Sequence, residues 1–462
     1  MKKLDKSCRF LSIPDRTKIV KRREGCHLLP VHLSPKWGLH VHTVDQEVRT
    51  LQNRHMFETP KASPEGLEEM RGEYKRMANI IGTVPRATHK ELMHNKLTRK
   101  LRRYNFGAKE YFARGVDRRD ARVKMMMKLE LHKVENLTKK ECRAIQYQGV
   151  VFNYALGRQL HHVERATYQA FRNPDGTNQV LKLHAPDQAA AQLWRGWHRF
   201  SNPVALCMDL KRCDAHHKKQ QLLLNHYYYK MVRGEEHKCG ELHKLLKMML
   251  TIRGISDGGI RYRAICRPSG AYDTGLGNTA TMLCMLRIAY PDANIYVNGD
   301  NAVVIMDSTS NILPAEYFLR FGFTMEFDVA RRYQDIEFCQ SKLIYSNNWG
   351  PLLARRPDKV AQTMFLHAMK LDRINKRRVL VGKALCELAT QSGVPYNSEL
   401  AALVLNKFGD VQPAFLDDES YIKFYAGKPI YREIDAHARA DMELAWGLAP
   451  HEFPYSDDIA YA

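Results

Sequence analysis

The chain lacks several features that mark particular classes of protein. Its 462 residues contain no apolar run that reaches the length of a membrane span, about 20 residues. Residues 1–5 lack the apolar core of a signal peptide. The chain also has no internal repeat and no low-complexity segment. We therefore expect any membrane association to be peripheral or to come through a partner.

Closely spaced cysteines are also missing. The ten cysteines include no C-x-x-C pair and follow no regular framework, which argues against a disulfide-stapled secreted protein. Free thiols in a reducing compartment are expected instead. The nearest approach to a zinc-binding set is Cys8, Cys26, His27 and His32, and its spacing matches no common zinc finger.

Acidic residues are scarce relative to basic ones. The 50 Asp and Glu residues stand against 72 Lys and Arg, which gives a net charge of +22 and a pI near 9.5. This charge favours a polyanionic partner, with nucleic acid as the first candidate and an anionic membrane surface as the second. Basic residues are dense over 90–128, with Tyr104, Phe106, Tyr111 and Phe112 interleaved. Such a segment suits a groove for single-stranded nucleic acid, although a solvated helical face would have the same composition.

A glycine–acid turn lies between two apolar segments at residues 296–306. Asn298-Gly299 is a strong short-range signal for a tight hairpin, because the turn needs positive φ at its centre. Asp300 lies in the same turn. Packing does not explain an acid at the tip of an apolar hairpin, so a metal ligand and a solvated turn acid are the two interpretations.

A second acid ends a predicted buried strand at residues 204–209, and Asp214 follows Asp209 with four residues between. We expect this strand to pair beside the hairpin, which would bring Asp209 near Asp300. Strand-end acids on neighbouring strands can hold two Mg²⁺ ions about 3.5–4 Å apart and so align attacking and leaving oxygens. The sequence therefore predicts a two-acid site for Mg²⁺.

Between the two acids in sequence, Ser269 and Gly270 precede a helix predicted over about 273–289. Gly270 would let the backbone approach a bound group closely. Thr274 and Asn278, four residues apart, would share one helix face. Ser, Thr and Asn side chains offer donors and acceptors that suit a ribose hydroxyl. An ordinary helix cap with polar residues is the alternative.

The order of these parts resembles motifs A, B and C of viral RNA-dependent RNA polymerases: Asp-x4-Asp, then Ser-Gly-x3-Thr-x3-Asn, then an apolar-flanked Gly-Asp-Asn. Other stretches are similar to the tombusvirus and carmovirus-like branch. Residues 133–135 with 143–146 are similar to motif F, and residues 321–325 with 337–340 are similar to motifs D and E. The resemblance covers about residues 128–345.

The resemblance implies an α+β right-hand fold, with fingers, palm and thumb and an antiparallel palm sheet flanked by helices. The implied division of the chain is an N-terminal extension (1–85), fingers (86–200 with 215–262), a palm (201–214 and 263–345), and a thumb with the C-terminal region (346–462). The implied function is an RNA-directed RNA polymerase that replicates a viral RNA genome.

By the same resemblance, Asp209 and Asp300 are catalytic, and together with Asn301 they would hold Mg²⁺, with Mn²⁺ as the alternative ion. The reaction would be in-line attack of an RNA 3′-hydroxyl on the α-phosphate of a nucleoside triphosphate, with pyrophosphate leaving. Ribose recognition is implied for Asp214, Ser269, Gly270, Thr274 and Asn278. Triphosphate contact is implied for Lys133 and Arg143.

The chain departs from the pattern of its apparent relatives at three positions. Asn301 stands where most positive-strand RNA virus polymerases have a second aspartate, so the second metal should be held less strongly. Gln148 stands where relatives tend to have another basic residue. Glu326 stands near the place of a motif D lysine, which leaves the general acid for pyrophosphate unassigned.

Two other functions stay open from the sequence. A reverse transcriptase shares the palm and the acids, but the Ser-Gly-x3-Thr-x3-Asn element favours ribonucleotides. A non-enzymatic basic RNA-binding protein is consistent with the charge alone. The resemblance implies RNA template and product, nucleoside triphosphates, and viral or host replication factors as partners. It also implies a location in the host cytoplasm, at a membrane-associated replication complex reached through a partner.

Overall fold

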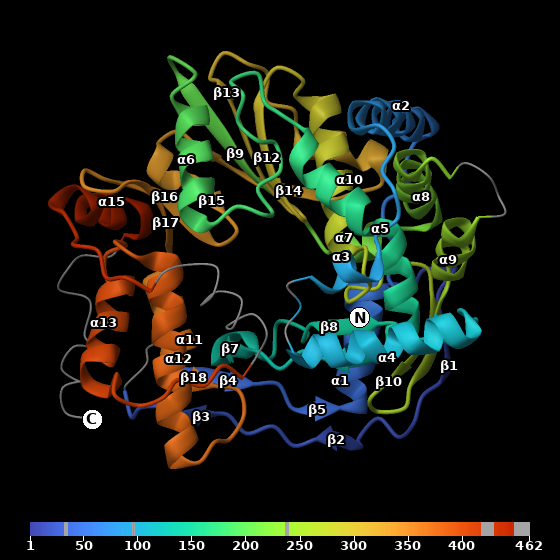
Figure 1. The fold of residues 1–462 in the computed structure, drawn as a ribbon, viewed down its shortest axis with the longest axis horizontal. Coiled ribbons are helices and arrows are strands. Elements are labelled where there is room, and N and C mark those ends of the chain that lie inside the picture. The colour runs from blue at the N-terminus through green and yellow to red at the C-terminus, as the bar shows by residue number, and fades with distance from the viewer. Residues whose placement is uncertain (32–35, 95, 97, 236–239, 417–428, 448–462) are drawn as a thin grey trace.

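The computed structural model describes residues 1–31, 36–94, 96, 98–235, 240–416 and 429–447, and Figure 1 shows their arrangement. Helices and strands are mixed along the chain, so the fold is α+β, as predicted. The strands are β1 (Arg9–Ser12), β2 (Ile19–Lys21), β3 (Cys26–His27), β4 (Trp37–Leu39), β5 (His42–Thr43), β6 (Val123–Met127), β7 (Leu131–Lys133), β8 (Ala144–Tyr147), β9 (Pro203–Leu210), β10 (Ile252–Ser256), β11 (Arg261–Ala264), β12 (Asn294–Asn298), β13 (Asn301–Asp307), β14 (Met325–Ala330), β15 (Glu337–Phe338), β16 (Ser341–Ser346), β17 (Gly350–Arg355) and β18 (Leu366–His367).

The helix predicted over about 273–289 is confirmed as α10. The α-helices are α1 (Val44–Thr50), α2 (Pro64–Ile81), α3 (His89–Met93), α4 (Thr98–Arg114), α5 (Val150–Ala170), α6 (Pro186–Trp197), α7 (Cys213–His216), α8 (Lys219–Arg233), α9 (Glu241–Met249), α10 (Thr274–Ala289), α11 (Pro357–Phe365), α12 (Arg373–Gln391), α13 (Asn397–Phe408) and α15 (Ala436–Trp446). No described helix is long and apolar enough to cross a membrane.

A four-stranded antiparallel sheet with the order β12-β13-β9-β14 forms the upper part of the molecule in Figure 1. The predicted hairpin is confirmed as β12 and β13, and the predicted strand beside it is β9. Both predictions succeeded because an apolar run bounded by a turn or an acid is a local pattern.

The two faces of this sheet enter different cores. Val204, Leu206 and Met208 point to one side and pack with helices that include α5, α8 and α10. Ala205 and Val303 point to the other side and pack with α6 and the β15–β17 region. Each fully buried Val or Leu side chain contributes about 1.5–3 kcal/mol. The sheet is therefore held from both faces, and its polar ends stay in a fixed position.

A second, five-stranded sheet has the order β1-β11-β10-β6-β8 and lies at the lower right of Figure 1. Its strands alternate buried and exposed residues, as in β6 and β10. The buried residues pack with Val44 and Val48 of α1 and with Leu51, which directly follows that helix. The opposite face of the sheet is exposed, because its alternate residues lie outside this core.

The C-terminal helices α11, α12 and α13 form a separate core at the lower left of Figure 1, beside the three-stranded sheet β15-β16-β17. Segments from residues 1–85 join several parts of the molecule. Strand β1 is an edge of the five-stranded sheet, β3 pairs with β18 beside α11, and β4 pairs with β7. Helix α2 packs on α8 and α10.

Candidate active site

Three polar side chains lie in a row across the end of the four-stranded sheet. Asp209 on β9 is paired with Asn301 on β13 and with Glu326 on β14. Residues directly opposite one another in antiparallel strands project from the same face, so the three side chains are neighbours. The predicted approach of the strand carrying Asp209 to the hairpin is confirmed by this pairing.

The turn that carries Asp300 is fixed from two sides. Gly299, at the first central position of the two-residue turn, has a φ of 71°, which fits a type II′ hairpin. The Gly299 N–H donates to Thr279 Oγ1 at 3.1 Å. The Leu210 N–H donates to the Asp300 carbonyl at 3.1 Å. The second bond ties the turn to the end of β9, which holds Asp300 beside Asp209.

Asp209 lies in a surrounding that disfavours its negative charge. Its pKa is raised to about 6, first because protein atoms displace water and then because Asp300 and Glu326 carry like charges. The side chain still has an exposed edge. Asn301 Nδ2 donates to Asp209 Oδ1 at 2.9 Å and orients this carboxylate. Glu326 pairs with Lys211.

Asp214 lies one turn beyond β9, on the short helix α7. The chain reaches it through Arg212, which has the left-handed φ of 53°. Asn278 Nδ2 donates to Asp214 Oδ1 at 3.1 Å. Burial raises the pKa of Asp214 to about 6, against the opposing effects of Asn278 and Arg267. The structure thus brings together two of the residues assigned to ribose recognition, and Asp300 also acts electrostatically on Asp214.

The Ser269–Gly270 loop is attached to the edge of β8. Ser269 Oγ accepts the Gln146 N–H at 3.1 Å and donates to the Ala144 carbonyl at 3.0 Å. The Gly270 N–H donates to the Gln146 carbonyl at 2.7 Å. A Cβ on Gly270 would lie 2.8 Å from Ile145 Cγ2 and 2.9 Å from the Gln146 oxygen. Glycine is therefore required at this position by the approach of the loop to β8.

Thr274 also bonds to its own loop. Its Oγ1 donates to the Pro268 carbonyl at 2.8 Å and to the Ala271 carbonyl at 3.0 Å, at the first position of α10. The hydroxyls of Ser269 and Thr274 thus hold the loop, while Asn278 and Asp214 contact each other.

The two cations assigned to the triphosphate are paired with acids. Lys133 Nζ lies 3.7 Å from Asp358 Oδ2 on α11. Arg143 Nε donates to Glu130 Oε2 at 2.8 Å. The pKa of Arg143 is raised, first by its hydrogen bond to Glu130 and also by the charge of Asp300. The guanidinium is therefore near the acidic centre. Gln148, the departure in this region, is buried.

A buried ion pair beneath the site was not predicted from the sequence. Arg267 Nη1 donates to Asp273 Oδ2 at 2.5 Å, and both side chains are about 1% exposed. Arg267 also donates to Asn225, and its backbone N–H donates to the Asp214 carbonyl at 3.0 Å. No spacing rule identifies a buried arginine. The only signal was the presence of two charges on either side of the Ser269–Gly270 loop.

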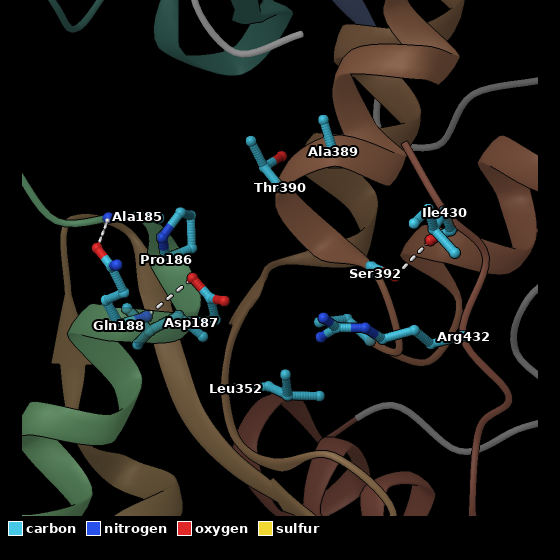
Figure 2. Close-up of a pocket in the computed structure, with 12 residues that line it drawn as sticks. Ala185, Pro186, Asp187, Gln188, Leu352, Ala389, Thr390, Ser392, Ile430 and Arg432 are labelled. Atoms are coloured by element: carbon cyan, nitrogen blue, oxygen red, sulfur yellow. Dashed lines mark hydrogen bonds between the residues drawn. The ribbon is translucent and has the colours of Figure 1, made fainter. Parts of the chain in front are cut away.

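A cavity of about 340 Å³ lies away from these acids, between the start of α6, β17 and the end of α12 (Figure 2). Its lining includes Asp187, Leu352, Thr390 and Arg432, and none of the predicted site residues. The candidate active site is therefore the row of polar side chains at the end of the sheet.

A mixed α+β fold with carboxylates at the end of an antiparallel sheet is consistent with a polymerase domain. A family model described as viral RNA dependent RNA polymerase matches residues 41–451. The chain therefore belongs to the family of viral RNA-dependent RNA polymerases.

Several relatives carry the name RNA-directed RNA polymerase. The protein of carnation mottle virus is 26% identical over 429 residues, which cover 87% of this chain and 54% of that protein. For tobacco necrosis virus strain D the identity is 28%, over 66% of this chain and 45% of the relative. For melon necrotic spot virus it is 25%, over 95% and 59%. The chain thus spans roughly half the length of these relatives.

Polymerases of this family use divalent metal ions, and the donor set here fits one. No three His, Cys, Asp or Glu side chains among the described residues are gathered to hold a metal by themselves. Magnesium, however, is usually bound by one or two carboxylates together with substrate phosphates. Asp209 and Asp300 provide these carboxylates. The pKa of Asp209 is raised first by burial and then by the like charges of Asp300 and Glu326, and a bound cation would favour its ionised form. Of the zinc set considered above, His32 lies outside the described residues.

Proposed function

We propose that the chain is an RNA-directed RNA polymerase that copies an RNA template during replication of a viral genome. The observation that carries this proposal is the row Asn301–Asp209–Glu326 with Asp300 beside it, next to the Asp214–Asn278 pair. An acidic centre beside a pair of polar side chains that can bind a ribose suits a nucleoside triphosphate.

A right-hand architecture accounts for the three parts of the fold. The four-stranded sheet with α10 corresponds to a palm, because it carries the acids. The five-stranded sheet with α4 corresponds to fingers. Its strand β8 holds the Ser269–Gly270 loop, and Arg143 lies directly before this strand. Helices α11–α13 correspond to a thumb, which Asp358 joins to the fingers through Lys133.

The proposed reaction is in-line displacement at the α-phosphate of a nucleoside triphosphate. A bond forms between the 3′-oxygen of the RNA and the α-phosphorus, the bond to the bridging oxygen breaks, and pyrophosphate leaves. Asp209 and Asp300 would hold the cation, and Asn301 keeps Asp209 oriented. Mg²⁺, or Mn²⁺ in its place, supplies charge neutralisation and activation of the attacking oxygen. Lys133 and Arg143 bind the triphosphate once it displaces their acidic partners.

Asp214 and Asn278 recognise the ribose in this proposal, and Ser269, Gly270 and Thr274 support them by fixing the loop. Asn278 Oδ1 is buried without a hydrogen-bond partner among the described residues. An acceptor of this kind suits a 2′-hydroxyl, which both donates and accepts. We expect Asn278→Ala to reduce incorporation of ribonucleotides more than of deoxyribonucleotides. Ser269→Ala should reduce both alike, since its hydroxyl bonds to β8.

The deciding experiment is primer extension on an RNA template with purified protein and with rNTPs or dNTPs. Asp209→Asn and Asp300→Asn should each reduce incorporation by at least about 100-fold, because electrostatic stabilisation of the transition state is worth several kcal/mol. Binding of RNA should be retained. The matched control is Asp328→Asn, which removes an exposed carboxylate from β14 of the same sheet.

Two outcomes would replace the proposal. Preference of the parent protein for dNTPs would indicate a reverse transcriptase. Absence of incorporation by the parent, together with strong RNA binding that Asp209→Asn and Asp300→Asn leave unchanged, would indicate a basic RNA-binding protein without an enzymatic role.

A further inference from the structure

The exposed face of the five-stranded sheet carries a row of arginines. Arg9 on β1, Arg263 on β11 and Arg253 on β10 lie directly opposite one another on three neighbouring strands. All three are exposed. Neighbouring strands are about 4.8 Å apart, so these side chains start within about 10 Å of one another. Like charges placed opposite one another destabilise a sheet, which means that this row gains from an external counter-charge.

The row continues into a cationic hollow. Arg253 lines a cavity of about 410 Å³ together with the loop between α4 and β6 and with helix α9. Among the residues that the structure describes, no acid contributes to its lining, and the other cations around it are Arg118, Arg119, Arg122, Lys244 and Lys247. The nearby Asp120 is engaged by Arg114, and Asp117 accepts the N–H groups of residues 119 and 120.

Two more cations extend the same surface. Arg261 is opposite Ile255 on β11 and β10, and Lys124 is opposite Ile255 on β6. The surface thus has ten cations, which we call the cationic face: Arg9, Arg118, Arg119, Arg122, Lys124, Lys244, Lys247, Arg253, Arg261 and Arg263. These ten cations form no ion pair with any other residue that the structure describes.

The cationic face reaches the candidate active site at one edge. Met126 on β6 is exposed on this face and lies opposite Ile145 on β8. Ile145 in turn is the residue that a Cβ on Gly270 would meet at 2.8 Å. The strand order β8-β6-β10-β11-β1 therefore leads from the Ser269–Gly270 loop outward across the cations.

We propose that the cationic face binds the phosphate backbone of a single RNA strand outside the active site. This inference rests on the proposed function for its choice of RNA. Seven of the ten cations are arginines, whose planar guanidinium pairs with phosphate in two-point contacts and stacks on bases. Part of the face is a hollow, which a flat membrane surface cannot fill but a flexible strand can. The cationic face thereby extends the contact with a template beyond the nucleotides that lie at Asp209 and Asp300.

The test compares the parent protein with Arg9→Gln/Arg253→Gln/Arg263→Gln. Affinity for a long single-stranded RNA, measured by fluorescence anisotropy over a range of salt, should fall by about tenfold. The slope of log affinity against log salt should decrease by about 2, since each phosphate contact to a single strand contributes about 0.7. Incorporation should be unchanged on a primer–template that reaches the acids of the active site but is too short to reach the cationic face.

The control removes three exposed cations elsewhere, as Lys75→Gln/Lys219→Gln/Arg331→Gln, and should leave the salt slope nearer that of the parent. Lys244→Gln/Lys247→Gln, on the surface of α9, provides a second test if the sheet variant does not fold. Equal affinity and slope in parent and both face variants would overturn the inference. So would loss of binding to phosphatidylserine-containing vesicles with RNA affinity intact. Absence of incorporation by the parent itself would instead contradict the proposed function.

Discussion

Asn301 donates a hydrogen bond to the most crowded carboxylate of the site. Replacing it with aspartate removes the donor to Asp209 and adds a negative charge beside Asp300 and Glu326. We expect Asn301→Asp to bind Mg²⁺ more tightly, because an added carboxylate strengthens a hard-cation site. The Mg²⁺ concentration for half-maximal incorporation should fall about fivefold, equivalent to about 1 kcal/mol.

Asn202→Asp is the matched control for this change. It adds the same charge at the opposite end of β9, where Asn202 bonds to Ser308. A titration of incorporation rate against free Mg²⁺ compares the two variants. An unchanged requirement in Asn301→Asp would show that residue 301 does not face the bound ion.

The raised pKa of Asp209 predicts how the stability of the folded protein depends on pH. The unfolded carboxyl ionises near its ordinary value of 3.8, whereas the folded one keeps its proton up to about 6. The folded state therefore binds more protons between these values, and its stability falls as pH rises through this window. Asp209→Asn removes the effect. In metal-free buffer above pH 6 the variant should be more stable by about 1 kcal/mol, after allowance for the exposed edge of the carboxylate.

Thermal unfolding from about pH 4 to pH 8 with a chelator checks this expectation. The difference between variant and parent should shrink toward the acid end, and added Mg²⁺ should stabilise the parent more than the variant. Asp328→Asn, on the same sheet, should follow the parent at every pH. A lower melting temperature of Asp209→Asn at high pH would contradict the electrostatic account.

Among the elements, helix α10 depends on a glycine beside the buried ion pair. A Cβ on Gly277 would overlap the guanidinium of Arg267, which Asp273 and Asn225 hold in place. Overpacking of this kind costs about 1–3 kcal/mol. We expect Gly277→Ala to lower the melting temperature and to slow incorporation, because α10 also carries Asn278.

Gly72→Ala on α2 is the control for Gly277→Ala. The nearest atom to its added Cβ would be 3.8 Å away, so the change should stabilise the helix by about 0.5–1 kcal/mol. Differential scanning fluorimetry of both variants suffices. A melting temperature of Gly277→Ala equal to or above that of the parent would show that Arg267 can move aside.

The elements that the sequence revealed are those with a local signature. The hairpin around Asp300 and the strand ending at Asp209 were found because turn residues and apolar runs are adjacent in the chain. The Arg267–Asp273 pair had no such signature, because burial of a charge depends on the partners that the fold supplies. The same limit applied to Ser269, whose hydroxyl is engaged by β8, a segment far from it in sequence.

At the scale of the whole molecule, the strand pairings made by the N-terminal segments escaped prediction. Residues 1–85 show no sustained period, yet Arg9 pairs with Arg263 and His27 pairs with Leu366. A strand of two to four residues has too few positions to show alternation, and its partner lies hundreds of residues away. The arginine row of the cationic face was hidden for the same reason, since it exists only through the register of β1, β11 and β10.

A contact between β7 and the C-terminal helices affects the binding of the nucleoside triphosphate. Lys133 on β7 reaches Asp358 at the start of α11 across this boundary, at 3.7 Å and with both side chains partly exposed. An exposed ion pair contributes up to about 1 kcal/mol. A triphosphate that recruits Lys133 must break this pair. We expect Asp358→Asn to lower the KM for nucleoside triphosphate by about two- to fivefold, with kcat little changed.

Asp335→Asn is the matched control, because it breaks the exposed pair with Arg332 away from Lys133. Lys133→Ala should raise the KM, and adding Asp358→Asn to it should then have no further effect, since the cation to be released is gone. Steady-state incorporation kinetics on one template compare the parent with all four variants. A KM that rises in Asp358→Asn would mean that the ion pair orders the triphosphate site, and Lys133 would then act through the position of α11 instead of through direct contact.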